Sequence, residues 1–223
     1  FSKSMIAYVK DEYGVDPVYE AQAGEKETDF RSYLLKAKAT NPDALVCSGL
    51  VDETVRCLVQ SYEVGIPKSV ARVANSVASK VEVPTNAGKA AVGVSYAAAF
   101  AASDTRPIAK KFVKHIKSTY GVVPGHDFSQ MEDLLTMLKP ALEKAEKGFS
   151  GDLASDRKAV RDSIAGITNF TGLASGPISF CAAGTPECRD GNRTPVMIEY
   201  TKGGKNWKTK VAGTVTFNAS AGL

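Results

Sequence analysis

The feature that most constrains the fold is an alternation of amphipathic helical segments with short apolar runs in the first hundred residues. Apolar residues recur at helical spacing after Thr28 and after Asp52, two side chains that are good helix caps. These patterns predict helices at 2–13, 29–40 and 53–65, and strands at 16–22, 44–49 and 69–74. The order is typical of parallel α/β folds, in which crossover helices cover a sheet. The strand 44–49 carries no charge and is expected to be buried on both faces.

The second half of the chain follows a different pattern. A strand is expected within residues 90–100. Three amphipathic helices then follow with no strand between them, at 106–120, 128–147 and 156–167. Pro140 predicts a kink in the second of these helices. Segments rich in β-formers lie at 176–180, 194–213 and 215–218, with a turn at Gly203 and Gly204. Because three consecutive helices do not form a parallel sheet by themselves, this region is expected to need a sheet to pack against.

The charge of the chain is nearly balanced. Its 28 basic and 24 acidic side chains give a formal net charge of +4, and basic residues alternate with acidic ones instead of forming one arginine-rich stripe. Nucleic acid is therefore not an expected partner. The most apolar stretch, 90–102, is shorter than the roughly 20 residues that a membrane span needs. The N-terminus lacks the apolar core of a secretory signal, which predicts a chain that is either cytosolic or already processed.

The four cysteines fall into two local pairs, Cys47 with Cys57 and Cys181 with Cys188. Neither pair has the CxxC spacing of a zinc or redox site. Cys181 and Cys188 enclose a loop that a disulfide could close in an oxidising compartment, and two independent thiols are the alternative. Cys47 ends an apolar run and Cys57 lies in a predicted helix, so burial as small apolar residues competes with pairing. Spacing alone leaves both connectivities open.

Motifs for catalysis and cofactor binding are absent from the sequence. It contains no HExxH, GxSxG, GxxxxGK[ST] or GxGxxG, and its two histidines are His115 and His126. Adjacent acids such as Asp52 and Glu53 do not share a helix face, so capping and solvation explain them better than acid–base catalysis. We therefore expect no cofactor, no metal site and no enzymatic activity.

Five segments, taken together, carry a family resemblance. In chain order they are ETDFRSYLLKAKATNPDALVCSG, EVGIP, NAGKAAVGVSYAAAF, PIAKKFVKHIKSTYG and AVRDSIAGITNFTGLASGPISF. In order and spacing they resemble the periplasmic solute-binding proteins of branched-chain amino-acid type ABC importers. The resemblance implies a type I periplasmic binding fold, in which two α/β lobes joined by crossing strands close over a small ligand. It also implies a periplasmic location, with the signal peptide not in this chain, and docking on ABC permease membrane subunits.

The resemblance further implies that the chain is the C-terminal portion of a two-lobed protein, truncated at its N-terminus. Residues 1–98 with about 195–223 then form the second lobe. Residues 99–194 belong to the first lobe and lack its N-terminal sheet, so the missing N-terminal lobe of the same protein becomes a partner. Apolar faces that this lobe would cover are expected to be exposed at Leu134, Leu138 and Val160.

Ligands of such folds bind in loops beyond the carboxyl ends of the strands. Six residues in these loops are candidate ligand-binding residues: Ser48, Leu50, Asn75, Ser76, Asp127 and Phe128. The family's amino-acid binders place an acid after the strand corresponding to 69–74, where this chain has Asn75 and Ser76, and often a Tyr where it has Leu50. Since two neutral side chains do not balance a buried cation, a small neutral or anionic ligand is favoured, such as an aromatic or aliphatic acid or an amide. Phe128 could stack on an aromatic ligand or serve as a hydrophobic staple.

Three other functions stay open. The first is a branched-chain amino-acid binder, as in the family's name. The second is the ligand-binding segment of a sensor or receptor, because the same two-lobed module is used in signalling. The third is a hydrolase with Cys47 or Ser48 as nucleophile, against which counts the lack of an obvious His or Lys base near either residue.

Overall fold

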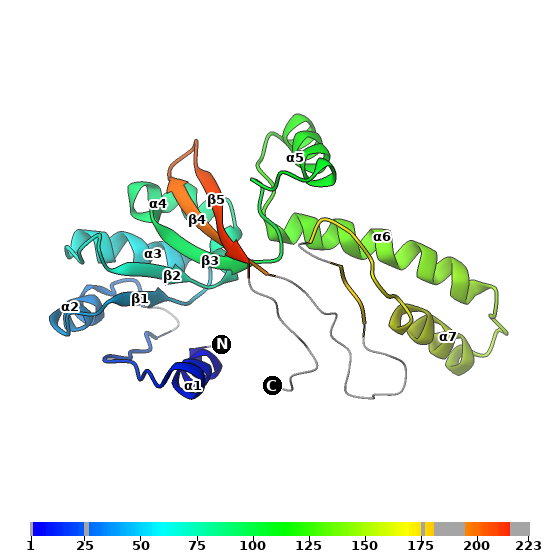
Figure 1. Cartoon of the computed structure of the whole chain (residues 1–223), viewed down its shortest axis with the longest axis horizontal. Helices are drawn as coiled ribbons and strands as arrows, with labels where there is room; N and C mark the ends of the chain where they lie inside the picture. The colour runs from blue at the N-terminus through cyan, green and yellow to red at the C-terminus, as the bar shows by residue number, and fades with distance from the viewer. Residues whose placement is uncertain (1, 25–26, 175–176, 181–194, 215–223) are drawn as a thin grey trace. The chain divides into compact units, whose positions relative to one another are not determined.

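The computed structural model describes residues 2–24, 27–174, 177–180 and 195–214 (Figure 1). The chain divides into two compact units, Phe1–Ala97 with Ile198–Lys210, and Ala98–Met197 with Val211–Leu223. It passes from one unit to the other near residues 97, 197 and 210. Both units contribute to a mixed α/β architecture, as the sequence predicts, and each is described below by itself.

The first unit contains a sheet with its helices. Its elements, some of whose strands run a few residues past the unit boundary, are α1 (Ser2–Tyr13), α2 (Arg31–Ala39), β1 (Ala44–Cys47), α3 (Val51–Glu63), β2 (Ala71–Ala74), η1 (Ser76–Ser79), α4 (Glu82–Ala87), η2 (Gly88–Ala91), β3 (Val94–Ala98), β4 (Val196–Lys202) and β5 (Lys208–Thr214). The strands form one sheet in the order β1-β2-β3-β4-β5 (Figure 1). β1 pairs in parallel with β2, and β2 in parallel with β3. The predicted alternation from α2 to β3 is confirmed, whereas the short helices between β2 and β3 are not evident in the sequence pattern.

The strand predicted at 16–22 is wrong. Residues 16–22 have no strand structure, and Val15 and Val18 are exposed. In the described sheet β1 is the edge strand, so no strand beyond it pairs with this segment. An isolated extended segment without a neighbour has only water for its backbone hydrogen bonds, and its β-propensity alone does not make it a strand.

The expected burial of β1 on both faces is also wrong. Cys47 is buried, but Ala44 is exposed and Val46 remains 42% exposed. The reason is the position of β1 at the edge of the sheet, which a run of uncharged residues does not reveal.

The predicted helix caps differ from the observed helix starts. α2 begins at Arg31, and it is Asp29, not Thr28, whose Oδ1 accepts a hydrogen bond from Arg31 N, over 3.1 Å. α3 begins at Val51 after Leu50 in extended conformation, so Asp52 lies inside the first turn instead of capping it. The predicted starts at 29 and 53 thus differ from the observed ones by two residues each, within the usual uncertainty of helix ends.

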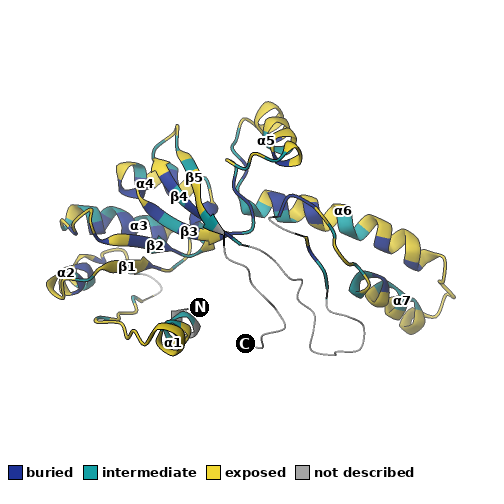
Figure 2. Ribbon diagram, in the orientation of Figure 1, coloured by how far each residue is buried: buried dark blue, intermediate teal, exposed yellow. Residues whose placement is uncertain are grey.

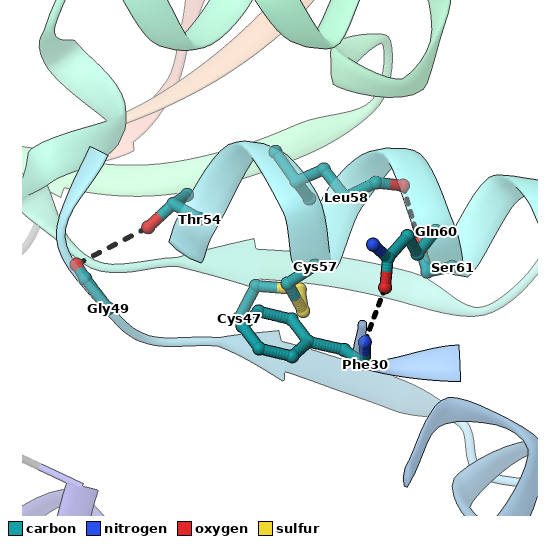
Figure 3. Close-up of a disulfide and its surroundings, with 8 residues drawn as sticks. All are labelled: Phe30, Cys47, Gly49, Thr54, Cys57, Leu58, Gln60 and Ser61. Carbon is teal, nitrogen blue, oxygen red and sulfur yellow. Dashed lines mark hydrogen bonds between the residues drawn. A yellow bond between two sulfur atoms is a disulfide. The ribbon is translucent and has the colours of Figure 1, made fainter. Parts of the chain in front are cut away.

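A buried amide links the start of α2 to α3. Gln60 on α3 accepts a hydrogen bond from Phe30 N, over 2.6 Å (Figure 3). It also donates one to Thr28 O, over 2.9 Å. Phe30 thereby enters an apolar cluster whose buried members are Phe30, Leu34, Ile66 and Val70. Because both polar ends of the amide are used, its burial carries little desolvation penalty.

Two buried tyrosines contact each other across β3 and β4. The rings of Tyr96 and Tyr200 have centroids 5.2 Å apart, and the Tyr200 hydroxyl donates to the carbonyl oxygen of Ala78. The ring of Trp207 meets Tyr200 edge-on at 6.0 Å. Burial disfavours the phenolate form, which raises the pKa of Tyr96 to about 12 and raises the pKa of Tyr200 as well.

Raising the pH above 10 is expected to destabilise the first unit. An unfolded tyrosine ionises near pH 10, whereas folded Tyr96 keeps its proton to about 12. The stability due to the protonated side chain is therefore complete below pH 10 and is lost as the pH rises toward the folded pKa. Urea unfolding at a series of alkaline pH values measures this loss. Tyr96→Phe should flatten the profile and the exposed Tyr120→Phe should not, so identical profiles for the two variants would contradict the assignment.

The second unit is mainly helical. Its helices are α5 (Pro107–Tyr120), α6 (His126–Glu146) and α7 (Leu153–Ala165), which confirms the three predicted helices with start positions shifted by one to three residues. α6 continues through Pro140. α6 and α7 lie side by side, and Ser163 Oγ donates to Ala141 O over 2.7 Å (Figure 1). The strand expected at 176–180 is wrong over its described residues, because Ile178 makes only a single bridge with Phe170.

The resemblance predicts exposed apolar faces at Leu134, Leu138 and Val160. Leu134 on α6 is 45% exposed, as expected, whereas Leu138 on α6 and Val160 on α7 are half-buried. Much of α6 is coloured as exposed in Figure 2. The most exposed apolar residues of this helix also include Met131, Leu135 and Leu142. No helix among the described residues is both long and apolar enough to span a bilayer. The predicted segment 215–218 and the Cys181 and Cys188 pair lie outside the described residues.

Two charged side chains hold the segment Gly172–Ala174 in the second unit. Asp133 of α6 is buried, and its two carboxylate oxygens accept hydrogen bonds from Leu173 N and Ala174 N, over 2.6 and 2.7 Å. The Arg106 guanidinium donates to the carbonyl oxygens of Gly172, Leu173 and Ala174. These bonds satisfy a stretch of backbone that has no sheet partner and place Leu173 against Phe100 and Ala109.

Asp133→Asn is expected to release this segment. An amide has one acceptor oxygen where the carboxylate uses two, so one buried backbone N–H loses its partner, at a cost of about 1–3 kcal/mol. Urea unfolding should record the loss, and hydrogen exchange at Leu173 and Ala174 should accelerate. Glu132→Gln, at the exposed neighbouring carboxylate, is the matched control and should change neither quantity. Unchanged exchange in Asp133→Asn would show that the carboxylate does not hold the segment.

Candidate functional site

Four of the six predicted ligand-binding residues come together at the carboxyl end of the sheet in the first unit. Parallel pairing sets Cys47 opposite Ala74, so the loops that follow β1 and β2 leave the sheet at the same edge. Ser48 and Leu50 follow β1, and Asn75 and Ser76 follow β2. Ser48, Leu50 and Ser76 are exposed, while Asn75 is half-buried. The carboxyl end of the sheet therefore presents polar groups from two loops on one surface.

Asn75 joins the two loops. Its Nδ2 donates a hydrogen bond to Gly49 O over 2.9 Å. The same carbonyl oxygen accepts from Thr54 Oγ1 over 3.3 Å (Figure 3). Gly49 is therefore bound both from the loop after β2 and from α3. A Cβ on Gly49 would lie 2.7 Å from the Cβ of Glu53, which explains why the position holds glycine. The turn from β1 into α3 is thus fixed on both sides.

Three buried polar atoms near this turn and in η1 have no hydrogen-bond partner among the described residues. They are Asn75 Oδ1, Glu53 Oε2 and Ser79 Oγ. A buried acceptor without a donor costs free energy, and such atoms at a surface loop are natural contacts for a ligand that carries N–H or O–H groups. The sequence pattern points to Asn75 but not to Glu53, because an acid next to Asp52 at a helix start is easily explained by solvation.

The start of α3 offers the opposite kind of partner. Leu50 is its N-cap residue, and none of the described side chains caps its first turn. The backbone N–H groups of that turn are suited to an anionic group, although Asp52 and Glu53 in the same turn weaken the local positive potential. Acceptors and donors therefore lie within a few residues of each other around Gly49.

Asp127 and Phe128, the other two predicted residues, belong to the second unit. Both lie in the first turn of α6, after Gly125 as N-cap residue. Asp127 Oδ1 is 2.7 Å from His126 Nε2, and Phe128 is 44% exposed. The structure therefore makes Phe128 accessible, which suits stacking on an aromatic group better than a role in a closed staple.

Two surface depressions lie elsewhere, in the second unit. One follows α5, and lysines make up half of its lining residues; the other runs along α6 beside Leu135 and Pro140. Both are open to solvent and include none of the six predicted residues. Over the described part of the chain, no group of three His, Cys, Asp or Glu side chains is placed to hold a metal ion.

Comparison with known proteins identifies the family. Residues 2–189 match the family described as Periplasmic binding protein, and the chain belongs to this family, as its sequence resemblance predicts. A comparison with curated proteins gives no match.

Three solved structures illustrate the shared fold. The leucine-binding protein of Thermotoga maritima has 23% identity and a TM-score of 0.76, over 96% of this chain and 56% of that one. A branched-chain amino-acid transporter substrate-binding protein of Streptococcus pneumoniae, in complex with isoleucine, has 21% identity and a TM-score of 0.78, over 97% of this chain and 57% of that one. An ABC-transporter solute-binding protein of R. palustris, in complex with benzoate, has 16% identity and a TM-score of 0.76, over 97% of this chain and 57% of that one. The fold is therefore the type I periplasmic binding fold, and the chain spans little more than half the length of these structures.

Asn75→Ala is expected to disconnect the two loops of the first unit. The variant removes the hydrogen bond to Gly49 O, worth about 0.5–1.5 kcal/mol, and should accelerate hydrogen exchange around Gly49. Urea unfolding and exchange mass spectrometry measure the two effects. Asn86→Ala, at an exposed amide on α4, is the control and should be neutral in both. If exchange around Gly49 is the same in the two variants, Asn75 does not fix the loop.

Proposed function

We propose that this protein is the extracytoplasmic solute-binding component of an ABC importer and binds a small neutral or anionic organic ligand by closure of two lobes. Family membership and the fold shared with ABC-transporter solute-binding proteins support this proposal. The observation that carries the ligand site is Asn75. Its Nδ2 links the loops after β1 and β2, and its Oδ1 is buried with no partner in the described chain. A donor group of the ligand supplies the missing hydrogen bond.

We assign the two lobes expected from the resemblance to the two compact units described above. The first unit corresponds to the second lobe, and the second unit corresponds to the first lobe. Residues 1–98 with about 195–223 form the second lobe, and 99–194 belong to the first. The division of the chain near residues 97 and 197 supports this assignment, whereas residues after Lys210 group with the other unit. A hinge at such crossings lets each lobe keep its own interior while the lobes close.

The ligand is an organic acid or amide that also carries a hydrogen-bond donor. Asn75 and Ser76 are neutral, so neither balances a buried ammonium group. The uncapped first turn of α3 supports a carboxylate end, and the unpaired Asn75 Oδ1 supports a hydroxyl or amide end. Ser48 and Leu50 complete the contacts from this unit. From the other unit Asp127 and Phe128 are further proposed contacts, Phe128 through its exposed ring.

A second candidate ligand is an α-amino acid. The observation that favours it is Glu53, whose Oε2 is buried and unpaired near Gly49 and supplies the negative charge that Asn75 and Ser76 lack. The solved structures named above include complexes with isoleucine and with benzoate, so the fold accommodates both classes.

Binding without catalysis is the function proposed for this site. Cys47 is bonded to Cys57 and buried, so it supplies no thiolate nucleophile. Ser48 has no hydrogen-bonded base among the described residues, which leaves a serine hydrolase without its activating group. The proposed partner of the closed form is an ABC permease, and a role as ligand-binding segment of a sensor uses the same site.

A ligand panel tests the proposal and separates the two ligand classes. The melting temperature of the protein is measured with benzoate, 3,4-dihydroxybenzoate, hexanoate, isoleucine and glutamine, because a ligand that binds only the folded state raises it. We expect an acid, above all the hydroxylated one, to raise the melting temperature, and Asn75→Ala to abolish the shift while Asn86→Ala keeps it. A shift with isoleucine and none with any acid would establish the amino-acid alternative. No shift with any member would count against the binding function.

A further inference from the structure

A disulfide bond lies directly beneath the candidate ligand loop. Cys47 is the last residue of β1, Cys57 lies in the second turn of α3, and the two are bonded with their Cα atoms 5.9 Å apart (Figure 3). The ring that they close contains Ser48, Leu50 and Glu53. The bond therefore encloses the β1–α3 turn on which the proposed ligand site depends.

The rest of α3 is held in place without this bond. Leu58 on α3 is fully buried, and Gln60 binds the entry to α2 through two hydrogen bonds. The cluster of Phe30, Leu34, Ile66 and Val70 has Cys57 only as a partly buried neighbour. These contacts do not depend on the sulfur–sulfur bond, so they continue to hold α3 when that bond is broken.

Apart from the disulfide, the end of β1, in contrast, is restrained within the described chain only by its ladder with β2 and by the two hydrogen bonds that Gly49 O accepts from Asn75 and Thr54. β1 has four residues and lies at the edge of the described sheet, so its only strand partner there is β2. Its last residue, Cys47, is paired with Ala74, one residue before Asn75. A short edge strand frays from its end, because it has a ladder on one side only. Fraying there would break the hydrogen bond from Asn75 Nδ2 to Gly49 O, which is 2.9 Å long.

We propose that the Cys47–Cys57 disulfide is a positioning element of the ligand site. It fixes the end of β1 to α3 and preserves the hydrogen bond from Asn75 to Gly49. The turn therefore stays in the conformation that binds the ligand. The inference rests on the proposed binding function. It predicts that loss of the disulfide lowers the affinity for ligand by more than the accompanying loss of stability explains. Preorganising a binding loop raises affinity because less ordering remains to be done when the ligand binds.

The test compares the oxidised protein with Cys47→Ala/Cys57→Ala and with the protein reduced by dithiothreitol. Reduction converts the disulfide to two thiols while dithiothreitol becomes its cyclic disulfide, so both sulfur atoms stay in the interior and no cavity forms. It also serves if the double variant does not fold. Calorimetric titration with 3,4-dihydroxybenzoate and with isoleucine, well below the melting temperature, should show affinity lower by roughly tenfold. Hydrogen exchange should accelerate at Gly49 to Thr54 and stay unchanged at Arg72 to Val73.

Two controls isolate the local effect. Leu34→Ala disturbs the apolar cluster of the same unit at a residue outside the ring that Cys47 and Cys57 close. It should lower the melting temperature at least as much as loss of the disulfide does, yet leave affinity and exchange at Gly49 unchanged. Dithiothreitol added to Cys47→Ala/Cys57→Ala should have no further effect, which separates the bond from Cys181 and Cys188.

Each remaining outcome decides the inference. Unchanged exchange at Gly49 to Thr54 after loss of the bond overturns it, and so does an affinity loss that Leu34→Ala reproduces at equal stability. If both probes bind and the reduced protein binds them equally well, the positioning role is wrong while the binding function stands. If neither probe binds the oxidised protein but exchange responds as expected, the binding function fails and the restraint on the turn stands.

Discussion

The parallel pairing of β1 with β2 is the constraint on which the candidate site depends. Because Cys47 lies opposite Ala74, the two loops that follow these residues begin at the same height on one edge of the sheet. Asn75 can then reach Gly49, and the turn into α3 becomes a fixed surface. A shift of the register by one residue would turn Cys47 away from α3 and remove both the disulfide and the amide link. The site is a consequence of strand register before it is a consequence of any single side chain.

The second unit is mainly helical, so some of its non-helical backbone needs hydrogen-bond partners other than neighbouring strands. Asp133 and Arg106 supply hydrogen bonds to Gly172–Ala174 that a neighbouring strand would otherwise supply. Charged groups suit this purpose because their hydrogen bonds are stronger than those of neutral groups. The exposed leucines of α6 belong to the same picture: their periodicity makes an amphipathic helix, while the described chain covers only part of its apolar side (Figure 2).

Some of the site could be predicted from the sequence and some could not. Asn75 and Ser48 could be predicted from the sequence because they lie at the carboxyl ends of recognisable strands, and the loops after parallel strands gather at one end of the sheet. Glu53 could not be predicted, because its significance lies in a buried, unpaired Oε2, and burial of a single carboxylate oxygen depends on tertiary packing. The bond between Cys47 and Cys57 was likewise undecided, since ten residues of separation permit pairing but do not bring two Cα atoms to 5.9 Å.

The sequence by itself determined the helices other than η1, α4 and η2, the strands from β1 to β5, the turn at Gly203 and Gly204 and the family, because hydrophobic periodicity and turn residues act over a few neighbours in the chain. Only the tertiary structure decided which strand lies at the edge, where α2 and α3 begin, and which acceptors remain unpaired. The failure at 16–22 gives the physical reason. A strand exists only when a neighbour takes up its backbone hydrogen bonds, and a local pattern contains no information about that neighbour.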